Sequence, residues 1–233
     1  MKRIIKISLI LLLVGMAVIA AVPFLKEKRA EKKYENDFKK IQESVIEKKS
    51  DVNVLVKKNK YCIGYVEIPG TTISYPVMQT KDNPDFYLNH DFNRNYSFYG
   101  TPYLSAYCDV KKSDNLIIYG HNINGGKMFG ALEKYKDKEF FNKHRKIYFT
   151  TDKKRKYEVF AVMSVNIHEF EYWKFVMARD AKKYDEFVDK VEEYSLWRQG
   201  NKPKYGEQTL MLSTCDNKKG DNWRIVFIGK EIF

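Results

Sequence analysis

The sequence predicts a mainly β domain that follows an N-terminal helical segment, and three observations predict it. Beyond residue 60, short runs rich in β-branched and aromatic residues alternate with turn residues. Only three segments there have the spacing of apolar residues that indicates a helix. Hydrophobic residues make up 44% of the 233 residues and aromatic residues 15%, enough apolar surface to order a core, which excludes a disordered chain. Many short strands with few helical connections indicate a barrel or a sandwich, in one domain with an appendage.

The N-terminal segment is predicted to be a transmembrane signal anchor. Residues 7–25 form an uncharged apolar run with basic residues on both sides, and this run of nineteen residues just spans a bilayer core about 30 Å thick. We predict that residues 1–6 are cytoplasmic and that the bulk of the chain lies outside the cell, although the flanking charges alone do not fix this orientation. A cleaved signal peptide and a buried core helix are the alternatives.

A highly charged segment, residues 26–60, joins this run to the predicted main domain. Within it, an apolar residue recurs every three or four positions, at Tyr34, Phe38, Ile41 and Val45. This spacing places the four side chains on one side of a helix. We predict a juxtamembrane amphipathic helix that lies on the main domain, followed by a linker; a solvated stalk is the alternative.

The basic charge of the chain belongs mostly to this N-terminal part. The net charge of +12 divides into +8 for residues 1–60 and +4 for residues 61–233. The excess therefore indicates contact with an acidic membrane surface, and it gives no support to a nucleic-acid partner, since no nucleic-acid-binding motif accompanies it.

Within the main domain, residues 61–233, each expected strand is bounded by turn residues. The expected strands are residues 61–68, 72–78, 101–107, 115–119, 146–151, 157–165, 209–213 and 224–231, and the expected helices are residues 84–89, 128–142 and 181–197. Residues 152–156, with four cations between two strands, are expected to form a solvated hairpin tip, with a binding patch as the alternative.

One of the three cysteines differs from the other two in its surroundings. Cys62 and Cys108 lie within apolar strand-like runs and are expected to be buried small hydrophobic residues. Cys215 instead follows an apolar strand and precedes a polar loop. A thiol at such a strand end is held by a rigid element and can be reached by a substrate, so Cys215 is a candidate nucleophile.

A cysteine nucleophile needs a proton partner and a group that stabilises negative charge. His121 follows the strand-like run 115–119, which is the same strand-to-loop position as that of Cys215. Arg224 begins the last strand, nine residues after the cysteine, so a strand–loop–strand unit can return its guanidinium beside the thiol. A strand-edge cation paired with a carboxylate is the alternative for Arg224. The Cys and His residues have no close metal-ligand spacing, so we predict neither a metal nor a cofactor.

Three motifs in this order resemble those of sortases, the cysteine transpeptidases that attach proteins to the cell wall of Gram-positive bacteria. Leu-Ser-Thr-Cys at 212–215 resembles the Leu-x-Thr-Cys signature, Tyr-Gly-His-Asn at 119–122 resembles the histidine motif, and Arg224 matches the arginine. The helix at 181–197, the added N-terminal helix and residues 87–92 resemble class B sortases in particular. The resemblance implies a closed β-barrel over residues 61–233, with the catalytic site in a groove at one end.

The resemblance also implies a reaction. Cys215 would attack the carbonyl after threonine in a C-terminal sorting signal of the Pro-x-Thr-Gly or Pro-x-Thr-Asn type and form a thioacyl enzyme, which a peptidoglycan amine resolves. His121 would transfer protons, and Arg224 would hold the carbonyl or the oxyanion. The family implies that four further residues line or support the substrate groove: Asn89, Tyr119, Ser213 and Thr214. Asp216 either orients His121 or is solvated in its loop.

The partners implied are surface proteins with a sorting signal and a peptidoglycan precursor or cross-bridge amine, at the outer face of the cell membrane. A purely hydrolytic cysteine peptidase of the envelope and a non-catalytic module that binds wall polymer are the competing interpretations.

Overall fold

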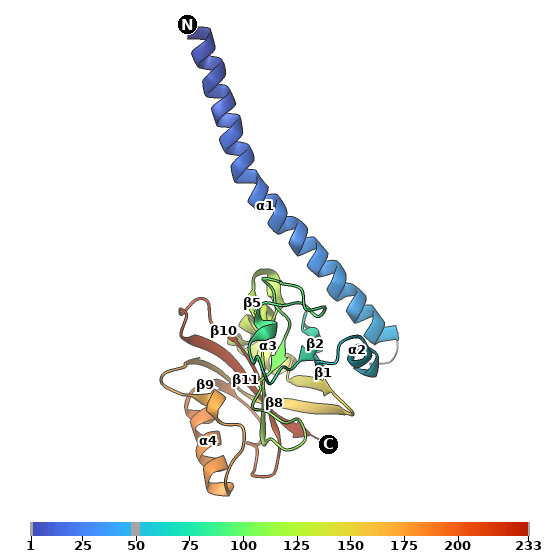
Figure 1. Ribbon diagram of the computed structural model, residues 1–233. Helices are drawn as coiled ribbons and strands as arrows, with labels where there is room; N and C mark the ends of the chain where they lie inside the picture. The colour runs from blue at the N-terminus through green and yellow to red at the C-terminus, as the bar shows by residue number, and fades with distance from the viewer. Residues whose placement is uncertain (1, 48–51, 233) are drawn as a thin grey trace. The chain divides into compact units, whose positions relative to one another are not determined.

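A computed structural model describes residues 2–47 and 52–232. The chain divides into two compact units, Met1–Lys48 and Lys49–Phe233. The first contains the single helix α1 (Lys2–Glu47), which continues without a break through the apolar run and the charged segment (Figure 1). A helix is therefore confirmed for this part of the chain as far as Glu47.

Two predictions for the N-terminal segment are not confirmed. Over the described residues, no helix is both long enough and apolar enough to cross a lipid bilayer, so the membrane span expected at residues 7–25 has no support from the structure. The side chains of Tyr34, Phe38, Ile41 and Val45, which were expected to form one apolar stripe, lie outside the described residues.

The second unit is a closed mixed β-barrel of eight strands, as the family resemblance implied. Neighbouring strands follow the order β11–β10–β4–β3–β2–β1–β7–β8, and pairing of β8 with β11 closes the barrel (Figure 1). The bounds are β1 (Cys62–Glu67), β2 (Ser74–Met78), β3 (Tyr103–Leu104), β4 (Asn115–Tyr119), β7 (Lys146–Thr150), β8 (Lys154–Asn166), β10 (Thr209–Cys215) and β11 (Trp223–Ile232). Each lies within or close to an expected strand, because the apolar runs that predicted the strands also fill the interior.

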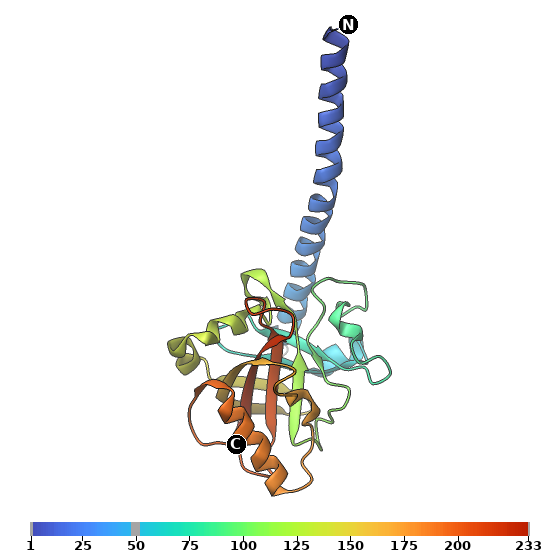
Figure 2. The same ribbon diagram turned by 90° about the vertical axis from the view of Figure 1, so that its left-hand side faces the viewer.

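Two kinds of neighbour pairing build the barrel. Most adjacent strands are antiparallel, but β4 pairs with β10 in parallel, with Tyr119 opposite Ser213. In Figure 2, β10 and β11 (red) lie beside β4 (light green). Strands β4 and β10 are buried along almost their whole lengths, and β11 is buried over its middle residues 225–229, so these stretches form the rigid part of the core. Parallel strands have their carboxyl ends at the same edge, so β4 and β10 end side by side.

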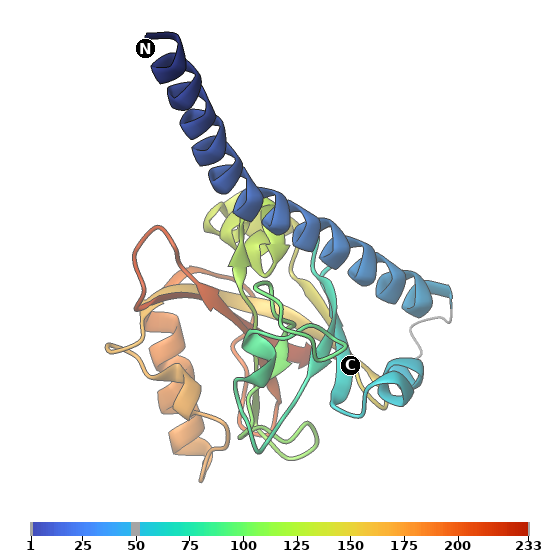
Figure 3. The ribbon, with the colours of Figure 1, turned by 45° about the horizontal axis from the view of Figure 1, so that its top comes forward.

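Helices and short elements surround the barrel. Helices α2 (Val52–Lys58) and α4 (Ala181–Glu193) lie on opposite sides of it (Figure 3). The side chain of Asp180 caps α4 by accepting a hydrogen bond from the backbone N–H of Lys183 at 2.9 Å. Four apolar residues spaced at i, i+3, i+4 and i+7 form its buried face: Tyr184, Phe187, Val188 and Val191. The remaining elements are η1 (Phe86–Leu88), the hairpin β5 (Asn122–Ile123) and β6 (Lys127–Met128) with η2 (Asn124–Gly126) between them, η3 (Gly130–Lys136), α3 (Lys138–Lys143) and η4 (Tyr172–Lys174).

The structure corrects four expected elements. The helix expected over residues 84–89 is only the three-residue 3-10 helix η1, and the helix expected over residues 128–142 divides into the 3-10 helix η3 and the short α-helix α3. The helix expected over residues 181–197 ends at Glu193. The strand β9 (Ser195–Arg198) follows it and pairs with β8 as a ninth strand, outside the closed set of eight. The hairpin tip expected over residues 152–156 is shorter, because β8 resumes at Lys154 and pairs Lys154 with Thr150. For β9 the cause is pairing with a strand distant in the sequence, which overrides the local helical pattern.

Candidate active site

The two predicted reactive side chains lie at neighbouring strand ends. Tyr119 in β4 is opposite Ser213 in β10, and two residues further along each chain come His121 and Cys215. Cys215 is the last residue of β10 and is partly exposed, unlike the buried Cys62 and Cys108. The parallel pairing thus brings together two segments that are more than ninety residues apart in the sequence.

Arg224 lies directly across the hairpin from the thiol. The antiparallel register of β10 and β11 pairs Cys215 with Arg224. The Nη1 atom of Arg224 donates hydrogen bonds to the main-chain oxygens of Asp221, at 2.6 Å, and Trp223, at 2.9 Å. Among the described residues Arg224 makes no ion pair, so no carboxylate neutralises its charge, and the alternative of a paired strand-edge cation is not what the structure has.

These three residues line one pocket of about 510 Å³ at this end of the barrel. Tyr119, Ser213 and Thr214 line it as well. Asn89 does not, although its neighbour Leu88 does; the side chain of Asn89 is exposed, and its main-chain oxygen accepts a hydrogen bond from Ser97. The structure therefore brings together six of the seven predicted site residues.

The orientation of His121 is set by main-chain contacts. Its Nε2 atom donates a hydrogen bond to the carbonyl oxygen of Leu88 at 2.8 Å, since a carbonyl only accepts. The ring of Phe98 lies nearly parallel to the imidazole, with centroids 6.4 Å apart. Gly120 precedes the histidine, and a Cβ atom there would approach the Phe129 ring to 2.8 Å, so the chain packs too closely at this position for a side chain.

Two residues of the pocket lining, Ser213 and Thr214, have side-chain hydroxyl groups. Tyr172 and Ser213, both buried, share a hydrogen bond of 2.7 Å between their side-chain oxygens. Burial raises the pKa of Tyr172 to about 12, against the lowering effect of Ser213 and Arg224, so this hydroxyl keeps its proton at neutral pH. The buried hydroxyl of Thr214 has no hydrogen-bond partner among the described residues.

Sequence reasoning missed several other lining residues. Asp85, the residue before η1, is one of them, and its Oδ1 accepts a hydrogen bond from the hydroxyl of Tyr103 at 3.0 Å. Tyr107, which is 81% exposed, and Trp173 complete an aromatic rim. Asp85 falls in an expected helix and Trp173 in an aromatic segment outside the expected strands, so neither position showed a strand-end pattern that would have singled it out.

Asp216, next to the thiol, takes neither of the two roles considered for it. Its side chain is fully buried, and its oxygens accept hydrogen bonds from Lys136 Nζ and from Ser164 Oγ, both at 2.7 Å. It neither contacts His121 nor is solvated. Because Lys136 lies eighty residues earlier in the chain, no local pattern reveals this pair.

The ionised side chain of Asp216 is expected to make the stability of the fold depend on pH. Burial acts to raise its pKa, but the bonds from Lys136 and Ser164 outweigh burial and hold the pKa below its ordinary value. A lowered folded-state pKa stabilises the fold above the unfolded-state pKa, and this contribution is lost as pH falls through the folded-state value. We expect the free energy of unfolding of Asp216→Asn to fall less steeply than that of the wild type as the pH is lowered. The measurement is urea denaturation at a series of pH values from pH 7 to pH 3. Asp189→Asn, at an exposed helix position, is the control; an unchanged acid limb in Asp216→Asn would contradict the assignment.

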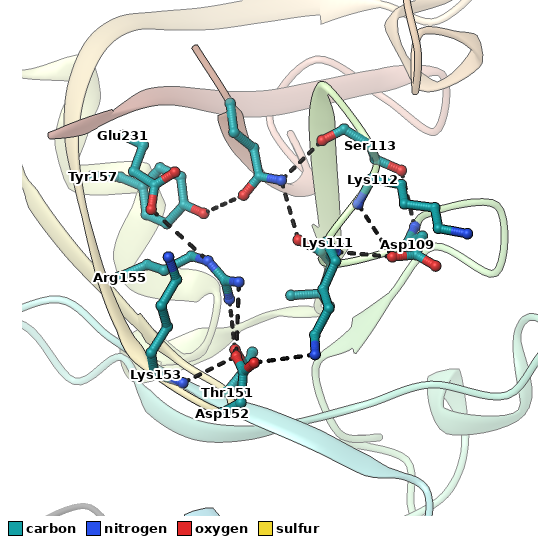
Figure 4. Close-up of polar contacts among 12 residues, drawn as sticks. Asp109, Lys111, Lys112, Ser113, Thr151, Asp152, Lys153, Arg155, Tyr157 and Glu231 are labelled. Atoms are coloured by element: carbon teal, nitrogen blue, oxygen red, sulfur yellow. Dashed lines mark hydrogen bonds and ion pairs between the residues drawn. The ribbon is translucent and has the colours of Figure 1, made fainter. Parts of the chain in front are cut away.

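A second hollow, of about 320 Å³, lies at the opposite end of β10 and β11 and includes part of the expected hairpin tip. Figure 4 shows how Arg155 lies in it: Nη1 donates to Thr151 Oγ1 at 2.6 Å, and carboxylates of Asp152 and Glu231 lie 3.7 and 3.8 Å from the guanidinium. Lys111 lies 3.3 Å from the same Asp152. Arg155 is therefore buried and paired, and not a solvated cation as expected. The lining of this hollow contains no cysteine or histidine, so the candidate active site is the first pocket.

A closed barrel with a cysteine, a histidine and an arginine around one pocket defines a class of cysteine transpeptidase. The sequence model of the sortase domain matches residues 66–232, and the chain belongs to the sortase family. It is a cysteine transpeptidase of that family.

Within the family, the similarity is to sortase B proteins. The chain is 31% identical to sortase B of Listeria monocytogenes over 191 residues, covering 79% of this chain and 75% of that protein. It is 29% identical to sortase B of Staphylococcus aureus, covering 100% and 98%. A structure of the Staphylococcus aureus sortase B–substrate complex matches with a TM-score of 0.78 at 26% identity and covers 87% of this chain and 97% of that one.

Proposed function

We propose that this sortase cleaves a C-terminal sorting signal of the Pro-x-Thr-Gly or Pro-x-Thr-Asn type after threonine and joins the surface protein to a peptidoglycan amine. The observation that carries the proposal is the single pocket lined by Cys215, His121 and Arg224. Family membership supplies the substrate classes, namely surface proteins and a peptidoglycan acceptor.

The reaction is an exchange of one amide bond for another through a thioester. The Cys215 thiol gives its proton to His121, its sulfur attacks the threonine carbonyl, and the π electron pair of the C=O bond moves to oxygen. As the tetrahedral intermediate collapses, the peptide C–N bond breaks and His121 gives a proton to the leaving amine. The acceptor amine then attacks the thioester and gives up a proton to His121, and the C–S bond breaks to release the cysteine.

Arg224 has the role of stabilising negative charge. Its guanidinium is opposite Cys215 and carries no paired carboxylate among the described residues. A fixed donor of this kind stabilises a developing oxyanion by about 3 kcal/mol. Tyr119, Ser213 and Thr214 are proposed to contact the sorting signal, because all three line the same pocket as Cys215. Asn89 stays a prediction from the resemblance.

The experiment that tests the function uses a fluorescent peptide with a Pro-x-Thr sorting motif, with and without an added amine such as triglycine. We expect cleavage after threonine and, with the amine, a ligated product identified by mass spectrometry. A thioester adduct is expected to accumulate when the amine is omitted. Only the hydrolysed acid, even at saturating amine, would identify a hydrolytic peptidase and contradict the proposal.

Attachment to a membrane through residues 7–25 is a further part of the proposal, and it rests on the sequence alone. The uncharged apolar run favours it, although no helix among the described residues is both long and apolar enough to cross a bilayer. We expect the full chain to sediment with the membrane fraction of Gram-positive cells and a chain lacking residues 1–25 to leave it. Added protease should digest the main domain in intact cells. A full chain found only in the soluble fraction would overturn the anchor without affecting the reaction.

A further inference from the structure

A network of charged and amide side chains lies behind the pocket and joins the two segments that carry Cys215 and His121. It is centred on η3, whose Glu133 and Lys136 side chains are only 21% and 26% exposed. Lys136 Nζ lies 3.1 Å from Glu133 Oε2, so the two form an ion pair within one turn of the helix. Neither residue lines the pocket.

On the cysteine side, the network attaches at the residue after the thiol. Lys136 Nζ donates to Asp216 Oδ1 at 2.7 Å, and Ser164 Oγ in β8 donates to Oδ2 at 2.7 Å. The backbone N–H of Asp216 donates to the main-chain oxygen of Trp223 at 2.9 Å. Both carboxylate oxygens and the amide of this fully buried residue are therefore engaged, and any shift of the end of β10 breaks at least one of these bonds.

On the histidine side, the network attaches at the residue after the imidazole. One atom, Asn122 Nδ2, donates to Glu133 Oε1 at 3.0 Å and to the main-chain oxygen of Cys215 itself at 2.8 Å. Asn122 is thus in contact with η3, with the strand end that carries the thiol and, through the chain, with His121. A side-chain amide provides two N–H donors in one plane, so it can hold two acceptors at a fixed separation.

The charges make this arrangement stiff. Lys136 is the cation of two carboxylates: its charge-assisted hydrogen bond to Asp216 is 2.7 Å long, and Glu133 Oε2 lies 3.1 Å away as an ion pair. A charge-assisted hydrogen bond to a buried carboxylate is strong. Catalysis through a thioester depends on small differences in the position of sulfur and imidazole, and a misplacement of 1 Å costs about 10²-fold in rate.

We propose that Asn122, Glu133, Lys136 and Asp216 are positioning residues, and that η3 is the common support that fixes the main chain of Cys215 and the His121 loop relative to each other. This inference rests on the proposed roles of Cys215 and His121. It assigns no contact with the substrate to the four residues.

Asn122→Ala tests the proposal, with Asn124→Ala as the matched control, since Asn124 is an exposed asparagine of the same loop. We expect Asn122→Ala to lower kcat for the sorting peptide by about tenfold or more, with KM within about twofold because the pocket lining is unchanged. We also expect a shifted pH profile for alkylation of Cys215 by iodoacetamide, which a merely structural role would not produce. Asn124→Ala should match the wild type in all three measurements.

Lys136→Met is the second variant, and Lys134→Met, on the same helix, is its control. If Lys136→Met does not fold, the combined neutral variant Glu133→Gln, Lys136→Met, Asp216→Asn removes the unpaired buried charge. Lys136→Arg keeps the charge and the donors and is expected to retain most of kcat. In whichever of these variants folds, adding Asn122→Ala should give a double variant whose loss of kcat is smaller than the product of the two separate losses. The reason is that both changes act through the same support, η3.

The outcomes separate this inference from the proposed function. Retained activity in Cys215→Ala would end the proposed function itself. If Cys215→Ala is inactive but Asn122→Ala has the kcat and alkylation profile of Asn124→Ala, the positioning role is wrong and the reaction stands. A change in KM alone would also overturn the inference, because it would place Asn122 in substrate binding.

Discussion

Cys215→Ala is expected to lose transpeptidation by a factor on the order of 10⁴–10⁶, because alanine has no atom that can form the thioester. Both half-reactions pass through the same sulfur, so neither cleavage nor ligation should persist. The measurement is chromatography of the sorting-peptide products over long incubations, with mass spectrometry to show that the thioester adduct is absent. Cys215 is at a strand end and partly exposed, so the variant should fold as the wild type does.

Cys108→Ala is the matched control for this prediction. Burial raises the pKa of Cys108 to about 11 and that of Cys62 to about 12, so both thiols are protonated at neutral pH and neither faces the pocket. We expect Cys108→Ala to keep most of its activity, and iodoacetamide to label Cys215 alone in the native protein. Loss of activity in Cys108→Ala with retention in Cys215→Ala would reverse the assignment of the nucleophile.

Arg224→Ala is expected to have the second largest effect, a loss of about 10²-fold in kcat/KM, corresponding to about 3 kcal/mol of transition-state stabilisation. The reason is the position of the guanidinium, opposite Cys215 in the hairpin register and without a carboxylate partner among the described residues. Its bonds to the main-chain oxygens of Asp221 and Trp223 contribute about 1 kcal/mol each to the loop, so the fold should survive.

Two variants define what Arg224 does. Arg224→Lys keeps the charge but loses the planar fork, so we expect an intermediate rate. Arg198→Ala removes an arginine that is 63% exposed on β9 and should leave kcat/KM unchanged. Steady-state kinetics on the sorting peptide give the comparison. An Arg224→Ala enzyme as fast as Arg198→Ala would show that charge stabilisation comes from another donor.

The parts of the site that could be predicted from sequence are those built from neighbouring residues. Cys215 and Arg224 belong to one strand–loop–strand unit, and its nine-residue spacing already implied that they face each other. His121 was a weaker prediction from its residues alone, because its position beside β10 depends on a parallel pairing across the barrel. The family resemblance, and not the periodicity of the sequence, connected His121 to the cysteine. The same resemblance predicted a closed barrel, where the strand pattern alone allowed a barrel or a sandwich.

The parts that sequence missed depend on distant partners. Leu196 and Trp197 extend the apolar pattern of α4, yet they form a strand because the edge of β8 offers backbone hydrogen bonds there. Asp216 begins a polar loop, and only the arrival of Lys136 and Ser164 allows a carboxylate to be buried there. Pro84 and Asp85 belong to a short turn whose placement beside the pocket has no local signature.

The parallel pairing of β4 with β10 also bears on how the protein folds. Contacts between residues close in sequence cannot form the pocket, because Cys215 and His121 come together only when β10 pairs with the distant strand β4. Pairings between distant strands form slowly. A partly folded chain therefore has a thiol without its histidine. For an enzyme that bonds covalently to its substrate, this order of events means that the complete catalytic pocket exists only after the barrel has closed.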